Sequence, residues 1–166
     1  MLIGFMGCGK SFVSKELSKV LQRPLMSTDA WIEAKEGRSI AQIFEESGES
    51  HFRNLEREAV KEIAQSEGSI IDGGGGIVLN PQNIMDLKKT GILFYLKASP
   101  EFLLKNIEKS KDRPLMKGTD PLAKIKELLQ MREPLYNQAD YTIDADYKTI
   151  DQIAASIVEV ISREGI

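Results

Sequence analysis

The sequence predicts an α/β fold of three layers, in which helices cover both faces of a central, mainly five-stranded parallel sheet. Three observations predict it. The glycine-rich pattern G-x-x-x-x-G-K-[ST] occupies residues 4–11, between a short apolar segment and an amphipathic stretch. Short apolar segments then alternate with longer stretches of helical periodicity, which is typical of a parallel sheet. The 166 residues are enough for one sizeable core and too few for two ordinary domains, so we expect a single domain.

The composition excludes several classes of protein. The net charge is −3 and the isoelectric point is about 5.4, so the chain lacks the basic character of a nucleic-acid-binding protein. Its longest apolar runs fall far below the roughly 20 residues of a membrane span. The single cysteine excludes an internal disulfide, and the first residues lack the layout of a signal peptide. We therefore expect a cytoplasmic protein that binds neither nucleic acids nor membranes.

The first predicted elements surround the glycine-rich pattern. The apolar segment 1–3 is the first strand, and it is shorter than the roughly five residues usual for a strand, so we interpret the sequence as starting partway along it. The first helix opens at about Gly9 and has apolar residues at helical spacing. It ends before Arg23 and Pro24, and residues 25–27 form the second strand.

A helical insertion, at about 29–66, separates the second strand from the third. Residues 30–36 are expected to be helical, and a short helix starts at the capping box of Ser39. A longer helix runs from about Glu49, and Gly48 is expected to break the chain between the two.

The rest of the chain supplies three strands and four helices. The strands are expected at 69–72, 91–96 and 141–144, where apolar residues dominate. Each helix has an apolar stripe or a capping residue at its start. The helices begin at about Asn80, Ser99, Asp120 and Ile150.

The glycine-rich pattern is typical of a loop that cradles a polyphosphate with its backbone amides, at the positive end of the following helix. The alternative is a glycine turn without a ligand. Lys10 can reach the terminal phosphates and is a candidate catalytic residue, and Ser11 is placed to bind the Mg²⁺ that bridges them. The other nucleotide-binding residues expected here are Gly7, Cys8, Gly9 and Phe12.

Two acidic residues follow strands at the carboxyl edge of the sheet, where open parallel sheets bind ligands. Asp29 follows the second strand and is a functional candidate, although Thr28 or Asp29 could instead cap the next helix. Asp72 ends the third strand, which is typical of a second magnesium-side element; the alternative is an incidental acid in a flexible loop. Four glycines follow Asp72 and favour the close approach of a ligand to the main chain.

Two groups of basic residues are further candidates. Arg53 and Glu56 lie one helical turn apart, a spacing that usually gives an exposed ion pair, but their place in the insertion favours a functional arginine. Basic residues gather in the segment 109–120 between two helices, where a closing lid is expected. Arg113 in this segment could place a guanidinium over the phosphates, whereas the alternative is an ordinary solvated surface.

Seven segments of the chain carry the motifs of one known family in the same order. They are residues 4–11, 28–33, 37–44, 52–56, 74–78, 113–115 and 132–136. On these segments the chain resembles the shikimate kinases from end to end. The resemblance implies a fold of the phosphate-loop kinase type and the transfer of the γ-phosphate of ATP to the 3-hydroxyl of shikimate, with Mg²⁺, on the route to chorismate.

The resemblance also implies a role for each matched residue. Asp29 would bind the substrate hydroxyls and act as the base. Arg53 and Arg132 would hold the carboxylate, because guanidinium groups fix a carboxylate through charge-assisted hydrogen bonds. Gly75 would supply backbone contacts to shikimate, and Arg113 would belong to the lid. ATP and shikimate are then the only expected partners, and we expect a monomer.

The chain departs from the family at several positions. Ser27 stands where the family has the first acid of Asp-Thr-Asp, and Asp72 stands where a serine or threonine is common. We hypothesise that the two positions have exchanged roles, so that Asp72 restores the negative charge beside the magnesium. Cys8 replaces a more usual serine, either as a neutral filler or as a reactive thiol.

Two other functions stay open from the sequence. Another small hydroxy-acid kinase, such as a gluconate kinase, also recognises a carboxylate, so the two arginines alone do not separate it from a shikimate kinase. A catalytically silent nucleotide-binding module is suggested only by the missing acid at Ser27.

Overall fold

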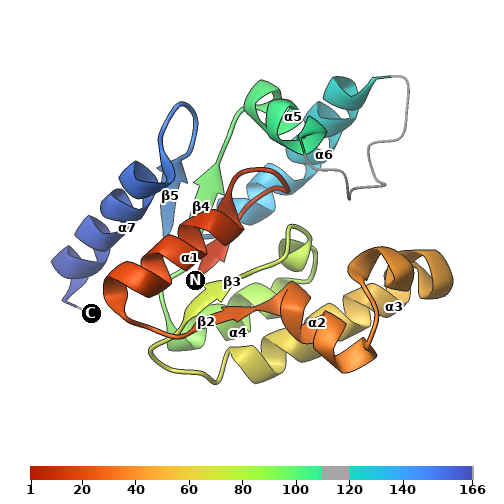
Figure 1. The fold of residues 1–166 in the computed structure, drawn as a ribbon, viewed down its shortest axis with the longest axis horizontal. Coiled ribbons are helices and arrows are strands. Elements are labelled where there is room, and N and C mark those ends of the chain that lie inside the picture. Colours follow the sequence, from red (N-terminus) through yellow and green to blue (C-terminus); the bar gives the residue numbers. More distant parts are fainter. Residues whose placement is uncertain (110–119, 166) are drawn as a thin grey trace.

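A computed structural model describes residues 1–109 and 120–165 and contains the predicted parallel sheet (Figure 1). Its strand order is β2-β3-β1-β4-β5. The chain leaves β1 toward one side of the sheet and leaves β3 toward the other, and α/β sheets bind ligands where their connections diverge in this way. The strands are β1 (Leu2–Ile3), β2 (Leu25–Ser27), β3 (Ile70–Asp72), β4 (Phe94–Lys97) and β5 (Tyr141–Asp144).

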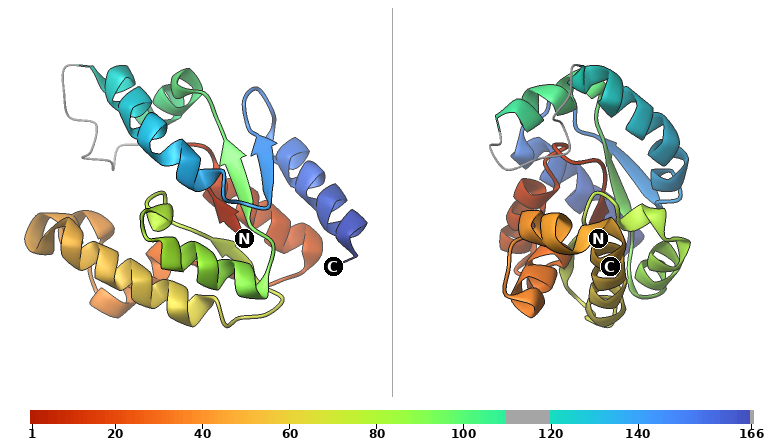
Figure 2. Two further views of the ribbon diagram at one scale, coloured as in Figure 1. Left: turned by 180° about the vertical axis from the view of Figure 1, so that it is seen from behind. Right: turned by 90° about the vertical axis from the view of Figure 1, so that its right-hand side faces the viewer.

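Helices cover both faces of the sheet, which confirms the three predicted layers. On one face α1 (Lys10–Leu21) packs beside α7 (Ile150–Glu164). On the other face lie α4 (Pro81–Thr90) and the C-terminal part of α6 (Pro121–Tyr136) (Figure 2). In the described parts of the chain, no helix is both long and apolar enough to cross a membrane.

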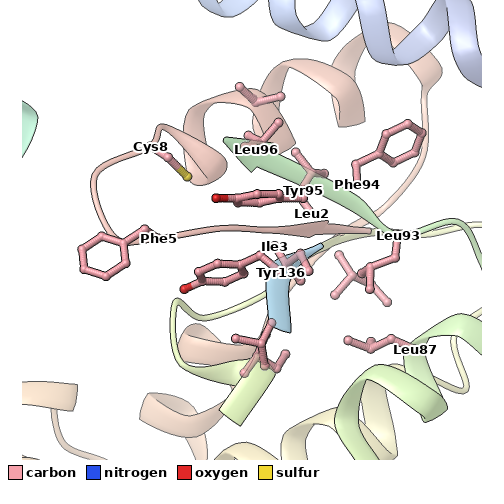
Figure 3. Close-up of a cluster of buried hydrophobic side chains, with 14 of the residues drawn as sticks. Leu2, Ile3, Phe5, Cys8, Leu87, Leu93, Phe94, Tyr95, Leu96 and Tyr136 are labelled. Atoms are coloured by element: carbon pink, nitrogen blue, oxygen red, sulfur yellow. The ribbon is translucent and has the colours of Figure 1, made fainter. Parts of the chain in front are cut away.

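The hydrophobic core is centred on β1 and β4, whose apolar side chains are almost completely buried (Figure 3). The rings of Tyr95 from β4 and Tyr136 from α6 stack at a centroid distance of 5.0 Å and an interplanar angle of 13°. Burial of this apolar surface is the main source of stability, at roughly 25 cal/mol per Å². It also fixes α6 to the sheet close to the carboxyl edge.

The predicted helix starts agree with the observed capping residues in all but one case. Asn80, Ser99 and Asp120 each accept a backbone N–H at the start of α4, α5 (Pro100–Glu108) and α6, respectively. The helix of the insertion, α2 (Thr28–Glu36), differs from the prediction. Its cap is Ser27, whose hydroxyl accepts the N–H of Ala30 at 3.3 Å. The alternative that Thr28 or Asp29 is the cap was wrong, and both lie inside the first turn.

The helices α2 and α3 (Ile40–Ile63) pack together beside β2 and form the predicted insertion (Figure 1). The expected interruption is present, because Gly48 has φ 78° and ψ 172° within α3. The chain therefore changes direction between the short helical piece and the longer one, which carries Arg53 and Glu56.

The fourth strand starts later than expected from its apolar run. Residues 91–93 precede β4, which extends instead to Lys97. Leu93 makes loop contacts, because its N–H donates to the Asp140 carboxylate at 2.9 Å and its carbonyl accepts the Asp140 N–H at 2.8 Å. A side chain thus takes the donor that a strand ladder would use. The short 3₁₀ helix η1 (Ile77–Leu79) was not predicted.

Candidate active site

The glycine-rich loop joins β1 to α1 at the carboxyl end of the central strand. Gly9 caps α1, whose first turn contains Lys10 and Ser11. The helix α5 supports the loop from another side, since the side-chain amide of Asn106 donates to the carbonyl oxygen of Gly7 at 2.9 Å. The loop amides and the start of α1 therefore form a candidate polyphosphate site, where the helix dipole favours negative charge.

Lys10 is buried beneath this loop. Its ammonium group donates to the carbonyl oxygens of Gly4 at 2.8 Å and Phe5 at 3.2 Å. The Cys8 sulfur lies 3.9 Å from the same nitrogen and is also buried. Burial of the thiol favours the interpretation of Cys8 as a neutral filler, because reactive cysteines are partly exposed.

Asp29 is placed by a contact between α2 and the glycine segment 73–76. The Thr28 hydroxyl is buried and accepts the N–H of Gly74 at 2.9 Å. A Cβ atom on Gly74 would come within 2.9 Å of Asp29 Oδ1 and within 3.1 Å of Glu56 Oε1. Asp29 therefore faces the same glycine segment as Glu56, although the two acids come from different helices.

Arg53 reaches this glycine segment from α3. Its guanidinium donates to Glu56 at 2.9 Å and to Glu49 at 2.9 and 3.2 Å. Burial lowers the pKa of Arg53, but the two carboxylates outweigh burial and raise it above the ordinary value. The guanidinium lies directly on Gly76, where a Cβ atom would be only 2.1 Å from Nη1. The side chain is therefore held charged and in one orientation.

Glu56 lies at the centre of the charged groups, a position that its sequence context did not predict. Its side chain is 2% exposed, and Oε1 has no hydrogen-bond partner among the described residues. Burial raises the pKa of Glu56, Arg53 and Arg132 lower it, and Asp29 raises it further. Its sequence signals were the i,i+3 spacing from Arg53, which also occurs in surface pairs, and its place at the end of the motif segment 52–56, which gave no role to the acid.

Arg132 comes from α6, on the far side of the glycine segment. Its guanidinium carbon lies 5.7 Å from the ring centroid of Phe5, a residue of the phosphate loop. Its charge also acts on Glu56, as described above. The structure thus brings Asp29, Arg53 and Arg132 together around Glu56, at the edge of the sheet where Lys10 lies.

The two positions of the proposed exchange are neighbours in the sheet. Ser27 of β2 is in register with Asp72 of β3, and Leu2 of β1 is in register with Asp72 on its other side. The Asp72 side chain is 8% exposed and forms no ion pair within residues 1–109 and 120–165. The Ser27 hydroxyl is engaged as the cap of α2. Among the described residues, Asp72 is therefore a carboxylate without an ion pair, beside a helix-capping serine.

Acidic side chains are too sparse here to hold a metal without other ligands. Within the described residues, no group of three or more His, Cys, Asp or Glu side chains could bind a metal ion. A lone carboxylate and the Ser11 hydroxyl suit Mg²⁺ bound to a nucleotide, because this ion keeps several waters and takes few protein ligands.

Two predicted nucleotide-side residues are not tied to this cluster by the structure. Phe12 lies in the first turn of α1 and is 68% exposed. Arg113 lies outside the described residues, as does the predicted lid except for its end residues, Lys109 and Asp120. The roles assigned to both residues stay predictions.

A phosphate loop on a parallel sheet of this strand order places the chain in a class of proteins, those with the phosphate-loop kinase fold. The family within this class follows from the sequence. The family model described as shikimate kinase matches residues 6–162, and the chain therefore belongs to the shikimate kinase family.

Curated relatives agree along almost the whole chain. A shikimate kinase of Caldanaerobacter subterraneus subsp. tengcongensis is 47% identical over 158 residues, which cover 95% of this chain and 92% of the relative. A shikimate kinase of Thermoanaerobacter pseudethanolicus is 42% identical over 163 residues, which cover 98% of this chain and 95% of the relative. The chain is therefore an ATP-dependent small-molecule kinase.

Solved structures agree with the fold. A shikimate kinase from Acinetobacter baumannii in complex with shikimate superposes with a TM-score of 0.93 at 34% identity, over 98% of this chain and 92% of that chain. A gluconokinase from Sinorhizobium meliloti has a TM-score of 0.65 at 14% identity, over 98% of this chain and 90% of that chain. The second likeness concerns the fold alone.

Proposed function

We propose that this chain transfers the γ-phosphate of ATP to the 3-hydroxyl of shikimate, giving shikimate 3-phosphate and ADP in the synthesis of chorismate. Family membership supports the substrate. The single observation that carries the proposal is the meeting of Asp29, Arg53 and Arg132 around one glycine segment beside the phosphate loop.

The substrate side recognises an anionic ring that carries hydroxyl groups. Arg53 and Arg132 bind the carboxylate, and the backbone of Gly75 adds a neutral contact. Asp29 then faces the ring hydroxyls and accepts the proton of the reacting one. Fixing both ends of a rigid ring orients this hydroxyl toward the phosphate, and orientation can supply a large part of the barrier reduction.

The phosphate side stabilises the transferred group. Lys10 neutralises charge on the β- and γ-phosphates, together with amides of the loop residues Gly7, Cys8 and Gly9. Ser11 and Asp72 would hold Mg²⁺, Asp72 through the ion's water shell. When bound, the ion supplies charge neutralisation of the phosphates. Support for Asp72 comes from its register with Ser27 and from the lack of an ion pair to its carboxylate in the part of the chain that the structure describes.

The helical insertion at about 29–66 is the substrate-binding part of a single domain, and the segment 109–120 is its lid. Within this proposal Arg113 of the lid reaches the phosphates, and Phe12 contributes to nucleotide binding. Replacing Arg113 by Ala should lower kcat without weakening the binding of shikimate alone. A change confined to shikimate binding would contradict the lid assignment.

We further propose that the enzyme acts as a monomer in the cytoplasm. The single cysteine suits a reducing compartment, and the net charge of −3 is unlike the strongly basic charge of a typical nucleic-acid-binding protein. Sedimentation of the enzyme at micromolar concentration gives its molar mass in solution and so tests whether it is a monomer.

A coupled assay of ADP release tests the function. The enzyme is mixed with ATP and Mg²⁺, and then with shikimate, with gluconate or with no acceptor. We expect ADP release only with shikimate. Release with gluconate instead would assign the other hydroxy-acid kinase activity, and binding of ATP without any acceptor-dependent release would identify a silent nucleotide-binding module.

A further inference from the structure

Tyr136 connects α6 to the glycine segment through a contact that the proposed function does not use. Its hydroxyl donates to the carbonyl oxygen of Gly75 at 2.5 Å, across 61 residues of sequence. The side chain is completely buried, and its ring stacks on Tyr95. Figure 3 shows the two rings nearly parallel, with both hydroxyls directed toward the side where Phe5 and Cys8 lie.

The residue that Tyr136 holds is a junction of the candidate site. A Cβ atom on Gly75 would lie 3.3 Å from the backbone nitrogen of Met6, in the phosphate loop. The next residue, Gly76, lies under the guanidinium of Arg53. The preceding residue, Gly74, faces Asp29. A shift of the Gly75 carbonyl would therefore disturb first the contacts of this segment with the two substrate-side helices, α2 and α3.

The hydroxyl of Tyr136 is also close to the second arginine. Arg132 precedes it by four residues on α6, so the two side chains lie on one helix face. Burial raises the pKa of Tyr136 above its ordinary value of 10, and this effect outweighs the lowering caused by Arg132. The hydroxyl thus stays protonated at neutral pH and remains a donor to Gly75.

We propose that Tyr136 is a positioning residue for shikimate: its hydroxyl fixes the Gly75 carbonyl and so sets the glycine segment between Arg53 and Arg132. This inference rests on the proposed function, since shikimate is taken as the ligand of that segment. The ring of Tyr136 packs in the core, and only its hydroxyl has the positioning role.

The test compares two variants that each remove one hydroxyl from the stacked pair. Tyr136→Phe keeps the ring and removes the bond to Gly75, whereas Tyr95→Phe removes a hydroxyl for which the described residues show no hydrogen bond. We expect Tyr136→Phe to raise KM for shikimate, and its Kd measured without nucleotide, by about 5-fold, which is typical for one lost neutral hydrogen bond. KM for ATP should change by less than about 2-fold, and Tyr95→Phe should behave as wild type.

A second measurement reports on the backbone itself. Hydrogen exchange of a peptide that covers residues 73–79 should be faster in Tyr136→Phe than in wild type or Tyr95→Phe. Unchanged exchange together with unchanged shikimate affinity would overturn the inference, as would equal losses for ATP and shikimate, which would indicate general destabilisation. Wild-type enzyme that neither binds nor phosphorylates shikimate would instead overturn the proposed function.

Discussion

At the scale of single residues, Glu56 is the point on which the substrate side depends. Its carboxylate is nearly inaccessible to water, yet it anchors Arg53 at 2.9 Å and lies close to Asp29. Burying a carboxylate is expensive unless it is paired, and removing one member of a buried pair costs several kcal/mol. Glu56 therefore orients Arg53, and the burial of its carboxylate lowers the stability of the folded state.

The pH dependence of stability should reveal this cost. Burial raises the pKa of Glu56 above its ordinary value of 4.5 in the folded state. Between the unfolded-state pKa of about 4.5 and the raised folded-state pKa, the folded state then binds more protons than the unfolded state. This group therefore destabilises the fold as pH rises from about 4.5. Glu56→Gln cannot titrate. The free energy of unfolding of wild type minus that of Glu56→Gln should therefore fall from pH 4.5 toward neutrality, and urea unfolding at each pH measures it.

A difference that stays constant with pH, or that grows in favour of wild type, would contradict the burial of a charged Glu56. Glu49→Gln is the matched control, because this residue makes the other ion pair of Arg53 and is exposed. Its difference from wild type should not follow the same trend.

The exchange between Ser27 and Asp72 predicts two separable effects. Asp72→Asn should weaken Mg²⁺ affinity, measured by calorimetry with ADP present, by about 10-fold, as is typical for outer-shell partners of a metal. Ser27→Ala should leave that affinity unchanged and lower stability by about 1 kcal/mol, because it removes the cap of α2. The double change Ser27→Asp with Asp72→Ser should restore Mg²⁺ affinity. A larger loss of affinity from Ser27→Ala than from Asp72→Asn would refute the exchange.

At the scale of elements, the glycine segment 73–76 acts as a surface on which side chains from three helices rest. Arg53 approaches Gly76 so closely that no side chain fits between them. Gly76→Ala should therefore displace the guanidinium while leaving the core intact. We expect KM for shikimate to rise about tenfold or more, as for the loss of a charged hydrogen bond, with little change in KM for ATP.

Gly91→Ala serves as the control for this prediction. A Cβ atom there would meet only the flexible end of the Met1 side chain, at 3.1 Å, far in sequence from the arginine cluster. If Gly76→Ala has the same KM for shikimate as Gly91→Ala, the guanidinium does not bind the substrate in the position seen here.

The bend in α3 at Gly48 depends on a backbone conformation that other residues avoid. Its φ of 78° with ψ of 172° lies in a region occupied essentially by glycine. Gly48→Asn should lower the free energy of unfolding by about 1–3 kcal/mol. Gly37→Asn, in the ordinary left-handed region at φ 67°, should cost much less because asparagine tolerates it. If urea unfolding gave equal losses of stability for Gly48→Asn and Gly37→Asn, the bend in α3 at Gly48 would not depend on a conformation reserved for glycine.

At the scale of the whole molecule, local sequence signals were sufficient for the layers and for most elements. Period and capping residues marked the helices, and the run at 141–144 matched β5 without error. The glycine-rich pattern located the phosphate loop because its chemistry lies in consecutive residues. Asp29 and Asp72 could be chosen as candidates because strand ends in a parallel sheet meet at one edge, and their roles stay predictions.

Features that join distant segments were not predictable in this way. The bond from Tyr136 to Gly75 spans 61 residues, and the bond from Asn106 to Gly7 spans 99. Neither leaves a local pattern, since tyrosine and asparagine are compatible with many helices. The start of β4 was misplaced for the same reason, because the Asp140 side chain, 47 residues away, takes the N–H of Leu93.

The most direct test is a crystal structure of the enzyme with shikimate and Mg·ADP. The shikimate carboxylate should lie between the guanidinium groups of Arg53 and Arg132, with the 3-hydroxyl near Asp29 and directed at the phosphate loop. Shikimate bound away from these arginines, or with its 3-hydroxyl turned away from Lys10, would contradict the proposed reaction geometry.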